Sequence, residues 1–156
     1  MQTIEELLSS HPFFAGLDAD VMRLIAGCAS NVHFAAGEFI FGEGDEASRF
    51  YVIRYGRVAL ELHSPARGPL VIDSMDQGEV VGWSWLIPPY RSFCDARAVT
   101  PVSATALDGA CLRGKCEANP VLGFQLLKRV SAVMYQRLQS TRVRLLDLYG
   151  KEPARI

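Results

Sequence analysis

Residues 34–61 read FAAGEFIFGEGDEASRFYVIRYGRVALE, and this stretch decides the fold. Short apolar runs at 39–41, 50–55 and 57–63 are separated by glycine-containing turns at 42–45 and at Gly56. The same alternation of apolar runs and turns continues before and after this stretch, with further candidate strands at 32–34, 70–74, 93–98 and 103–107. Short strands at such regular intervals are typical of a β sandwich or barrel. We therefore expect a β-roll over residues 31–108.

Helical patterns flank this region. Within residues 1–30, Thr3 and Glu6 have the spacing of a capping box, and Asp18 is placed to cap a second helix. After the roll, we expect a short helix over 109–118 and a long helix over 120–149, with Asn119 as the N-cap of the long one.

The long helix has the pattern of a coiled-coil seam. Its seam residues alternate spacings of four and three, at Leu127, Ser131, Met134, Leu138, Thr141, Leu145 and Leu148. A second stripe, Leu126, Val130 and Val133, is available to pack on the β domain. We expect the seam to pair with a second copy of the chain. The alternative is an amphipathic helix that folds back on its own domain.

The composition argues against several classes of protein. Hydrophobic residues make up 49% of the 156 residues, which is enough for a core without disulfides. The net charge of −1 argues against direct nucleic-acid binding, and no apolar run is long enough for a membrane span. We therefore expect a cytoplasmic protein. The basic residues of the long helix are expected on its solvated face: Lys128, Arg129, Arg137, Arg142 and Arg144.

The cysteines and histidines predict neither a metal site nor a catalytic group. No two cysteines have C-x-x-C spacing, and we expect four reduced thiols in or near the core: Cys28, Cys94, Cys111 and Cys116. The histidines are scattered, at His11, His33 and His63. A metal enzyme needs clustered ligands. We expect no metal, no cofactor and no enzymatic activity.

In this order, the segments resemble the cyclic-nucleotide-binding domain family, which includes catabolite-activator (Crp-Fnr-like) sensor domains and kinase regulatory subunits. Residues 11–29, HPFFAGLDADVMRLIAGCA, resemble the family's opening helix, and residues 34–61 resemble its glycine-punctuated strands. Residues 77–82, QGEVVG, look like the start of its phosphate-binding cassette. The resemblance implies one mainly β domain over 1–156, a double-stranded β-helix (jelly roll) with N-terminal helices and a long C-terminal helix.

The resemblance also implies a pocket for a cyclic nucleotide, cyclic AMP or cyclic GMP. In the family a cassette glutamate accepts the ribose hydroxyl, and Glu79, after Gly78, matches that position. We expect a helical turn to begin near Val80, where the free amides of Val80, Val81 and Gly82 would cradle the phosphate.

The family's phosphate-binding arginine has two candidates here. Arg91 fits only with an adjusted loop, whereas Ser92 fits the ungapped frame but carries no charge. Asp95, if it points inward, would repel a phosphate.

Two tryptophans in the cassette, Trp83 and Trp85, are unusual for the family. They either stack on a purine, fill the pocket with their own bulk, or pack beneath the adjacent proline loop. On the long helix, Ser131 is a candidate for contact with the ligand.

These features predict a small-molecule sensor that binds a cyclic nucleotide and passes the signal through the long helix to an unknown protein partner. The alternative is a degenerate fold that serves as a dimeric interaction or scaffold protein and no longer binds nucleotide. The family's transcription regulators carry a DNA-binding domain after the long helix, and we expect this chain to lack it.

Overall fold

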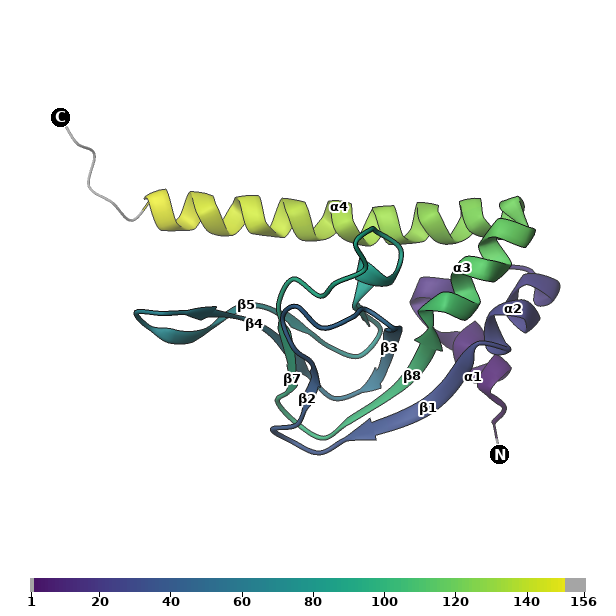
Figure 1. Ribbon diagram of the computed structural model, residues 1–156, viewed down its shortest axis with the longest axis horizontal. Helices are drawn as coiled ribbons and strands as arrows, with labels where there is room; N and C mark the ends of the chain where they lie inside the picture. The colour runs from purple at the N-terminus through teal and green to yellow at the C-terminus, as the bar shows by residue number, and fades with distance from the viewer. Residues whose placement is uncertain (1, 151–156) are drawn as a thin grey trace.

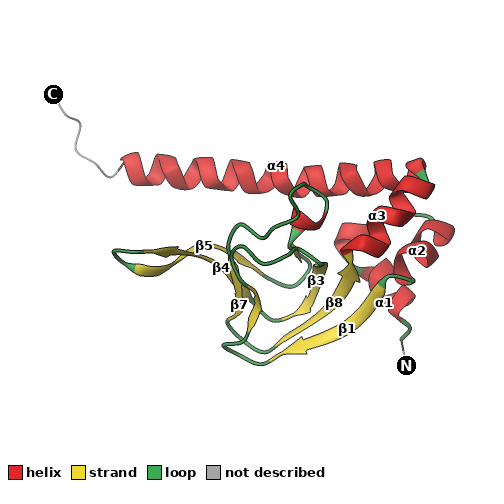
Figure 2. Ribbon diagram, in the orientation of Figure 1, coloured by secondary structure: helices red, strands yellow, loops and turns green. Residues whose placement is uncertain are grey.

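The fold is a β-roll with helices at one end and a long helix lying along it (Figures 1 and 2). The computed structural model describes residues 2–150, so the domain expected over 1–156 extends past them at both ends. The helical elements are α1 (Ile4–Ser10), η1 (Pro12–Phe14), α2 (Ala19–Ala26), η2 (Trp83–Trp85), α3 (Gly109–Ala118) and α4 (Pro120–Gly150). The strands are β1 (Ala29–Phe34), β2 (Phe39–Phe41), β3 (Arg49–Tyr55), β4 (Val58–Ser64), β5 (Gly68–Met75), β6 (Val80–Val81), β7 (Asp95–Ala98) and β8 (Val102–Asp108).

The strands form two antiparallel sheets, in the orders β1-β8-β3-β6 and β2-β7-β4-β5. The expected jelly roll is confirmed, and so is each of the expected strands. The helical turn expected near Val80 is wrong, because Val80 and Val81 form β6 and pair with Val52 and Tyr51 of β3. Gly82, with φ of 91°, turns the chain out of this strand, so the helical turn η2 begins only at Trp83.

The core has two parts. The first part fills the interior of the roll. The second part joins α1, α2, α3 and α4 to the outer side of the sheet β1-β8-β3-β6. Phe13 and Phe14 of η1 are buried in the second part, together with Leu126 and Val130 of the inward stripe of α4. The first half of α4 is therefore anchored to the roll, whereas the second half passes above the β4–β5 hairpin (Figure 1).

The expected helix caps are confirmed. The Thr3 side chain accepts from the backbone N–H of Glu6, whose carboxylate accepts from the N–H of Thr3. Asp18 caps α2 through the N–H of Val21, and Asn119 caps α4 through the N–H of Leu122. Among the described helices, none combines the length and the apolar character that a membrane crossing requires.

The prediction of four reduced thiols is wrong for two of them, because Cys28 and Cys111 form a disulfide. β1 begins directly after Cys28, and β8 ends just before Cys111, so the β1–β8 pairing brings the two cysteines together. The N–H of Asp108 also donates to the carbonyl of Cys28 (2.9 Å). Cys94 and Cys116 are free, and burial raises the pKa of the Cys94 thiol to about 12.

His11 predicts a pH dependence of stability. Its buried ring accepts the N–H of Phe13 at Nδ1 (3.2 Å), which leaves Nε2 to donate to the carbonyl of Ile53 (3.2 Å). Burial is the main cause that lowers the pKa of His11 below 6.5, its ordinary value. Above pH 6.5 the ring is neutral in both the folded and the unfolded chain, so its hydrogen bonds contribute fully to the stability of the fold. As the pH falls below 6.5, the unfolded chain binds a proton first, so the free energy of unfolding is expected to decrease.

Urea titrations between pH 8 and pH 5 measure this dependence. The His11→Asn variant is expected to have a smaller loss of stability across that range than the wild type. His33→Asn is the matched control, since it makes the same substitution at an exposed position. An identical profile for wild type and His11→Asn would contradict the assignment.

Candidate ligand-binding site

The cassette connects β6 to β7 across the open face of the roll. It starts at Gly82, where a side chain would be strained by the positive φ and would lie 3.3 Å from the carbonyl oxygen of Arg49. Glycine therefore allows the chain to turn tightly against β3 and to enter η2. As a result, Trp83 and Trp85, at the two ends of this short turn, lie in different surroundings.

Trp85 is part of the core and does not take part in a pocket. Its side chain is 0% exposed, and its ring lies 5.9 Å from the ring of Phe50. Its carbonyl accepts from the guanidinium of Arg113, which ties η2 to α3. Of the readings open for Trp85, packing is therefore the one that the structure supports; stacking on a ligand and occlusion of the pocket are wrong for this residue.

Trp83 faces the cassette pocket and fills it together with Phe93. The two ring centroids lie 5.7 Å apart, and the rings are tilted against each other by 31°. The cavity that remains beside them has a volume of only about 10 Å³. This is room for one water molecule at most, so in this conformation the cassette has no space for a phosphate.

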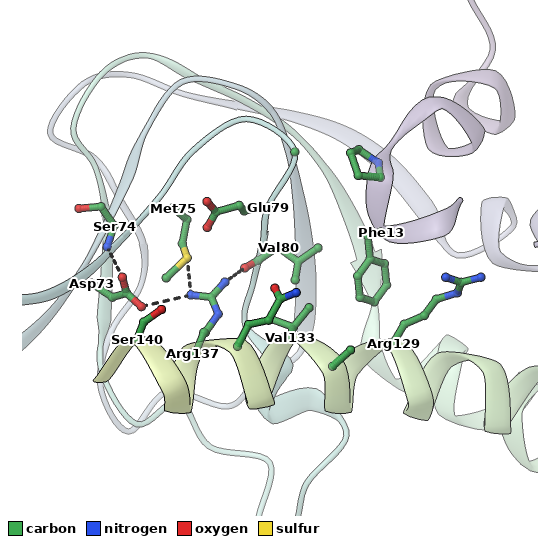
Figure 3. A pocket seen from close by; sticks show the side chains of 14 residues that line it. Phe13, Asp73, Ser74, Met75, Glu79, Val80, Arg129, Val133, Arg137 and Ser140 are labelled. Carbon is green, nitrogen blue, oxygen red and sulfur yellow. Dashed lines mark hydrogen bonds and ion pairs between the residues drawn. The ribbon is translucent and has the colours of Figure 1, made fainter. Parts of the chain in front are cut away.

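Glu79 lies away from the cassette cavity. It precedes β6, and its carbonyl accepts from the N–H of Ile53 (2.9 Å). Its carboxylate lines a separate polar cavity of about 500 Å³, on the side of α4 that faces η1, with Gly78 and Val80 (Figure 3). Partial loss of contact with solvent is the main cause that raises the pKa of Glu79, although the residue as a whole remains exposed. The structure thus does not bring Glu79 together with Arg91 or Ser92, the two side chains expected to bind the phosphate.

The two candidates for the phosphate ligand are separated as well. Arg91 is exposed on the outer loop, where its Nη1 lies 3.5 Å from the carbonyl oxygen of Gly44. Ser92 is buried and lines the small cassette cavity with Val81 and Gly82. Asp95 does not enter that cavity; it accepts the N–H of Glu43 (2.7 Å) and stabilises the turn at 42–45.

Arg137 of α4 is the residue that the sequence reasoning missed. The expectation of a solvated side chain is wrong for it, because only 14% of the side chain is exposed. Its guanidinium donates to the carbonyl of Val80 (2.6 Å), contacts the sulfur of Met75, and lies 3.7 Å from the carboxylate of Asp73 (Figure 3). It also lies above the ring of Trp83, 5.0 Å from its centroid.

A signal for Arg137 was present in the helical period. The inward stripe Leu126, Val130 and Val133 continues at a spacing of four to residue 137. The arginine therefore projects on the same face as the buried apolar residues, and its long side chain reaches the mouth of the roll.

A larger cavity, of about 730 Å³, lies between the roll and the second half of α4. We call it the helix cavity. Trp83 and Phe93 line it from the cassette, and β4 and β5 contribute Leu60, Leu62, Ile72 and Asp73. From α4 it receives Ser131, Met134, Tyr135, Arg137, Leu138, Thr141 and Arg144. Ser131 therefore faces a cavity, together with three other residues of the predicted seam.

Among residues 2–150, no three His, Cys, Asp or Glu side chains are grouped as they would be to hold a metal ion. The candidate site is thus a set of adjoining cavities beneath α4, lined by aromatic rings and a few charged groups. Within the described part of the chain, Arg137 alone lines all three: the cassette cavity, the polar cavity and the helix cavity.

Comparison with known proteins identifies relatives with the same fold. The chain is 25% identical over 154 residues to the "CRP-like cAMP-activated global transcriptional regulator" of Mycobacterium tuberculosis, over 98% of this chain and 67% of that protein. It is 32% identical to a putative cyclic nucleotide-binding protein of known structure from Geobacter metallireducens, with a TM-score of 0.79 over 88% of this chain and 99% of that one.

A cyclic nucleotide-binding domain from Methylobacillus flagellatus shares the fold, with a TM-score of 0.79 at 19% identity over 98% of this chain and 84% of that one. Residues 31–119 match the profile of the family described as "Cyclic nucleotide-binding domain". This match covers more than half of the chain and includes the cassette. The chain therefore belongs to the cyclic nucleotide-binding domain family.

Proposed function

We propose that this chain is a small-molecule sensor that binds a cyclic nucleotide between the roll and α4 and passes the signal through α4. The observation that carries the proposal is the helix cavity, whose lining comes from the roll and from α4 together. Its volume of about 730 Å³ lies in the range of roughly 300–1,000 Å³ typical of ligand pockets. A ligand there contacts both parts, so its binding energy can change how they fit.

The lining suits a ligand that combines a flat ring with one negatively charged group. The rings of Trp83 and Phe93 offer a surface on which a purine can stack. Two guanidinium groups, Arg137 and Arg144, face one carboxylate, Asp73, which leaves one positive charge uncompensated. A cyclic nucleotide combines a planar base with a singly charged cyclic phosphate, and the Mycobacterium tuberculosis relative is described as cAMP-activated.

The output of the sensor is the position of α4. The last part of its seam is uncovered in the single chain, with Leu145 47% and Leu148 65% exposed. A second copy of the chain would cover these residues, and this homodimer would present the moved helices to a protein partner. Light scattering that finds only monomers at micromolar concentrations would contradict the dimer. We expect the sensor to act in the cytoplasm, without a cofactor and without enzymatic activity of its own.

The degenerate alternative has an observation in its favour. The cassette cavity is filled by Trp83 and Phe93, and the cassette's own arginine, Arg91, lies outside it. If this arrangement is permanent, the chain no longer binds nucleotide and acts through α4 as an interaction or scaffold protein.

Titration calorimetry with cyclic AMP and cyclic GMP separates the two functions. We expect saturable heat with at least one of them, together with quenching of tryptophan fluorescence as the base stacks on Trp83. Trp83→Phe should abolish the fluorescence change, whereas Trp85→Phe should retain it. The Trp85→Phe variant is a fair control, because within residues 2–150 the buried indole Nε1 has no hydrogen-bond partner that phenylalanine would lose. No heat with either nucleotide on the folded chain would favour the scaffold function.

A further inference from the structure

We propose that the ligand's phosphate is bound by Arg137 and Arg144 of α4, and not by a residue of the cassette. The inference rests on the proposed function, since it assigns the anion-binding groups of the same site. It differs from the expectation drawn from the sequence, in which Arg91 or Ser92 had this part.

The cation that lines the cassette cavity comes from α4. Among the described residues that line it, the other side chains are aliphatic, aromatic, hydroxyl or thiol groups, and Arg137 alone is charged. Arg91 would need its loop to refold, because its backbone forms a bridge with Glu46 and its guanidinium points to Gly44. Arg137 is already at the position where the roll, the cassette and α4 meet.

Arg144 lies two helical turns after Arg137 and therefore on the same face of α4. Its Nη2 lies 2.9 Å from Oδ1 of Asp73, and the guanidinium also donates to the carbonyl of Ile72. Asp73 is thus shared by two arginines, with Arg137 at the longer distance of 3.7 Å. A phosphate oxygen can replace this shared carboxylate as an acceptor, because a guanidinium pairs with both in the same forked geometry.

The charged residues on the other side of Arg137 do not cancel the excess positive charge of Arg137 and Arg144 over Asp73. Glu79 lines the polar cavity there, but so does Arg129, which adds a further positive charge. Glu79 is also exposed, so solvent screens its effect on Arg137. A negatively charged ligand in the helix cavity is therefore attracted by two guanidinium groups and repelled mainly by Asp73.

The same two arginines that would bind the phosphate also attach α4 to the roll. When Arg137 and Arg144 turn to a phosphate, they leave the carbonyls of Val80 and Ile72 and the carboxylate of Asp73. These contacts hold the second half of α4 to β5 and β6. Ligand binding thus changes the attachment of α4 itself, without a step that passes through the cassette.

Calorimetry on five chains tests the inference: wild type, Arg137→Gln, Arg137→Lys, Arg144→Gln and Arg91→Gln, each with cyclic AMP and with uncharged adenosine. Loss of a charge-assisted contact to the phosphate is expected to weaken binding of cyclic AMP about tenfold or more in Arg137→Gln. A smaller, several-fold loss is expected in Arg144→Gln, whose side chain is half exposed. Arg91→Gln should be unchanged within about twofold. Adenosine should bind Arg137→Gln as it binds the wild type, and Arg137→Lys should recover part of the affinity for cyclic AMP.

The outcomes separate this inference from the proposed function. If the wild type binds cyclic AMP and Arg91→Gln loses it while Arg137→Gln does not, the inference is overturned and the sensor function stands. Equal weakening of cyclic AMP and adenosine in Arg137→Gln would show a structural role, and would also overturn the inference. If the folded wild type binds neither cyclic AMP nor cyclic GMP, the proposed function fails, and the inference fails with it.

Discussion

Replacement of Trp85 by alanine is expected to lower the free energy of unfolding by about 3–5 kcal/mol, the usual loss for a large aromatic side chain removed from a core. Trp85 is fully buried and joins the helical end of the molecule to the roll through Phe50. It also belongs to the core cluster that includes Leu112 of α3 and Leu122 of α4. Its removal leaves a cavity between β3, α3 and α4, which contribute Phe50, Leu112 and Leu122 to the same cluster. Urea denaturation followed by circular dichroism measures the loss.

Trp83→Ala is the matched control, since it removes the same side chain from the other end of the same helical turn. Trp83 is only partly buried, and its partners are Phe93 and Arg137 at the cavity edge. We expect a loss of about 1–2 kcal/mol, from one aromatic pair and one cation–π contact. If the two variants lost equal stability, the assignment of Trp85 to the core and Trp83 to the cavity would be wrong.

Removal of the Cys28–Cys111 disulfide is expected to lower the free energy of unfolding by about 2–4 kcal/mol. The bond joins residues 83 positions apart, so in the unfolded chain it closes a long loop and reduces the entropy of that state. In the folded chain it ties the end of α2 to the first turn of α3. Chemical denaturation with and without dithiothreitol measures the effect on the wild-type chain.

Two variants serve as controls for this measurement. The double variant Cys28→Ala, Cys111→Ala should have the stability of the reduced wild type and should not respond to dithiothreitol. Cys116→Ala should respond as the wild type does, because Cys116 is a free thiol. A wild type that is equally stable in both conditions would refute the stabilising role of the bond.

Much of the fold could be predicted from the chain because its signals are local. The strands around Gly56, the capping box of Thr3 and the N-cap Asn119 each depend on residues within one turn or one strand. β6 escaped prediction because two residues are too few for a recognisable alternation, and it exists only because it pairs with β3. The disulfide escaped for a similar reason, since the pairing of β1 with β8 places its cysteines together.

The candidate site was predicted less completely than the fold. Gln77–Gly82 was expected to start the cassette, but neighbouring residues from there onward face different spaces: Glu79 the polar cavity, Trp83 the helix cavity and Trp85 the core. In a tight turn, side chains that are one or two positions apart point in different directions. A short sequence pattern does not show which direction each side chain takes. Arg137 was placed among solvated charges because it lies far along the chain from the cassette.

By itself, the sequence determined the class of fold, the order of its elements and the apolar seam of α4. These follow from period, capping and turn chemistry, which act between residues close in the chain. Only the tertiary structure decided which charges meet at the pocket. Arg137 faces Trp83, Asp73 and Val80 because α4 folds back over the roll, and that contact joins segments more than fifty residues apart. The expected β-roll is therefore confirmed, and among the described residues the cation that lines its cassette cavity comes from α4.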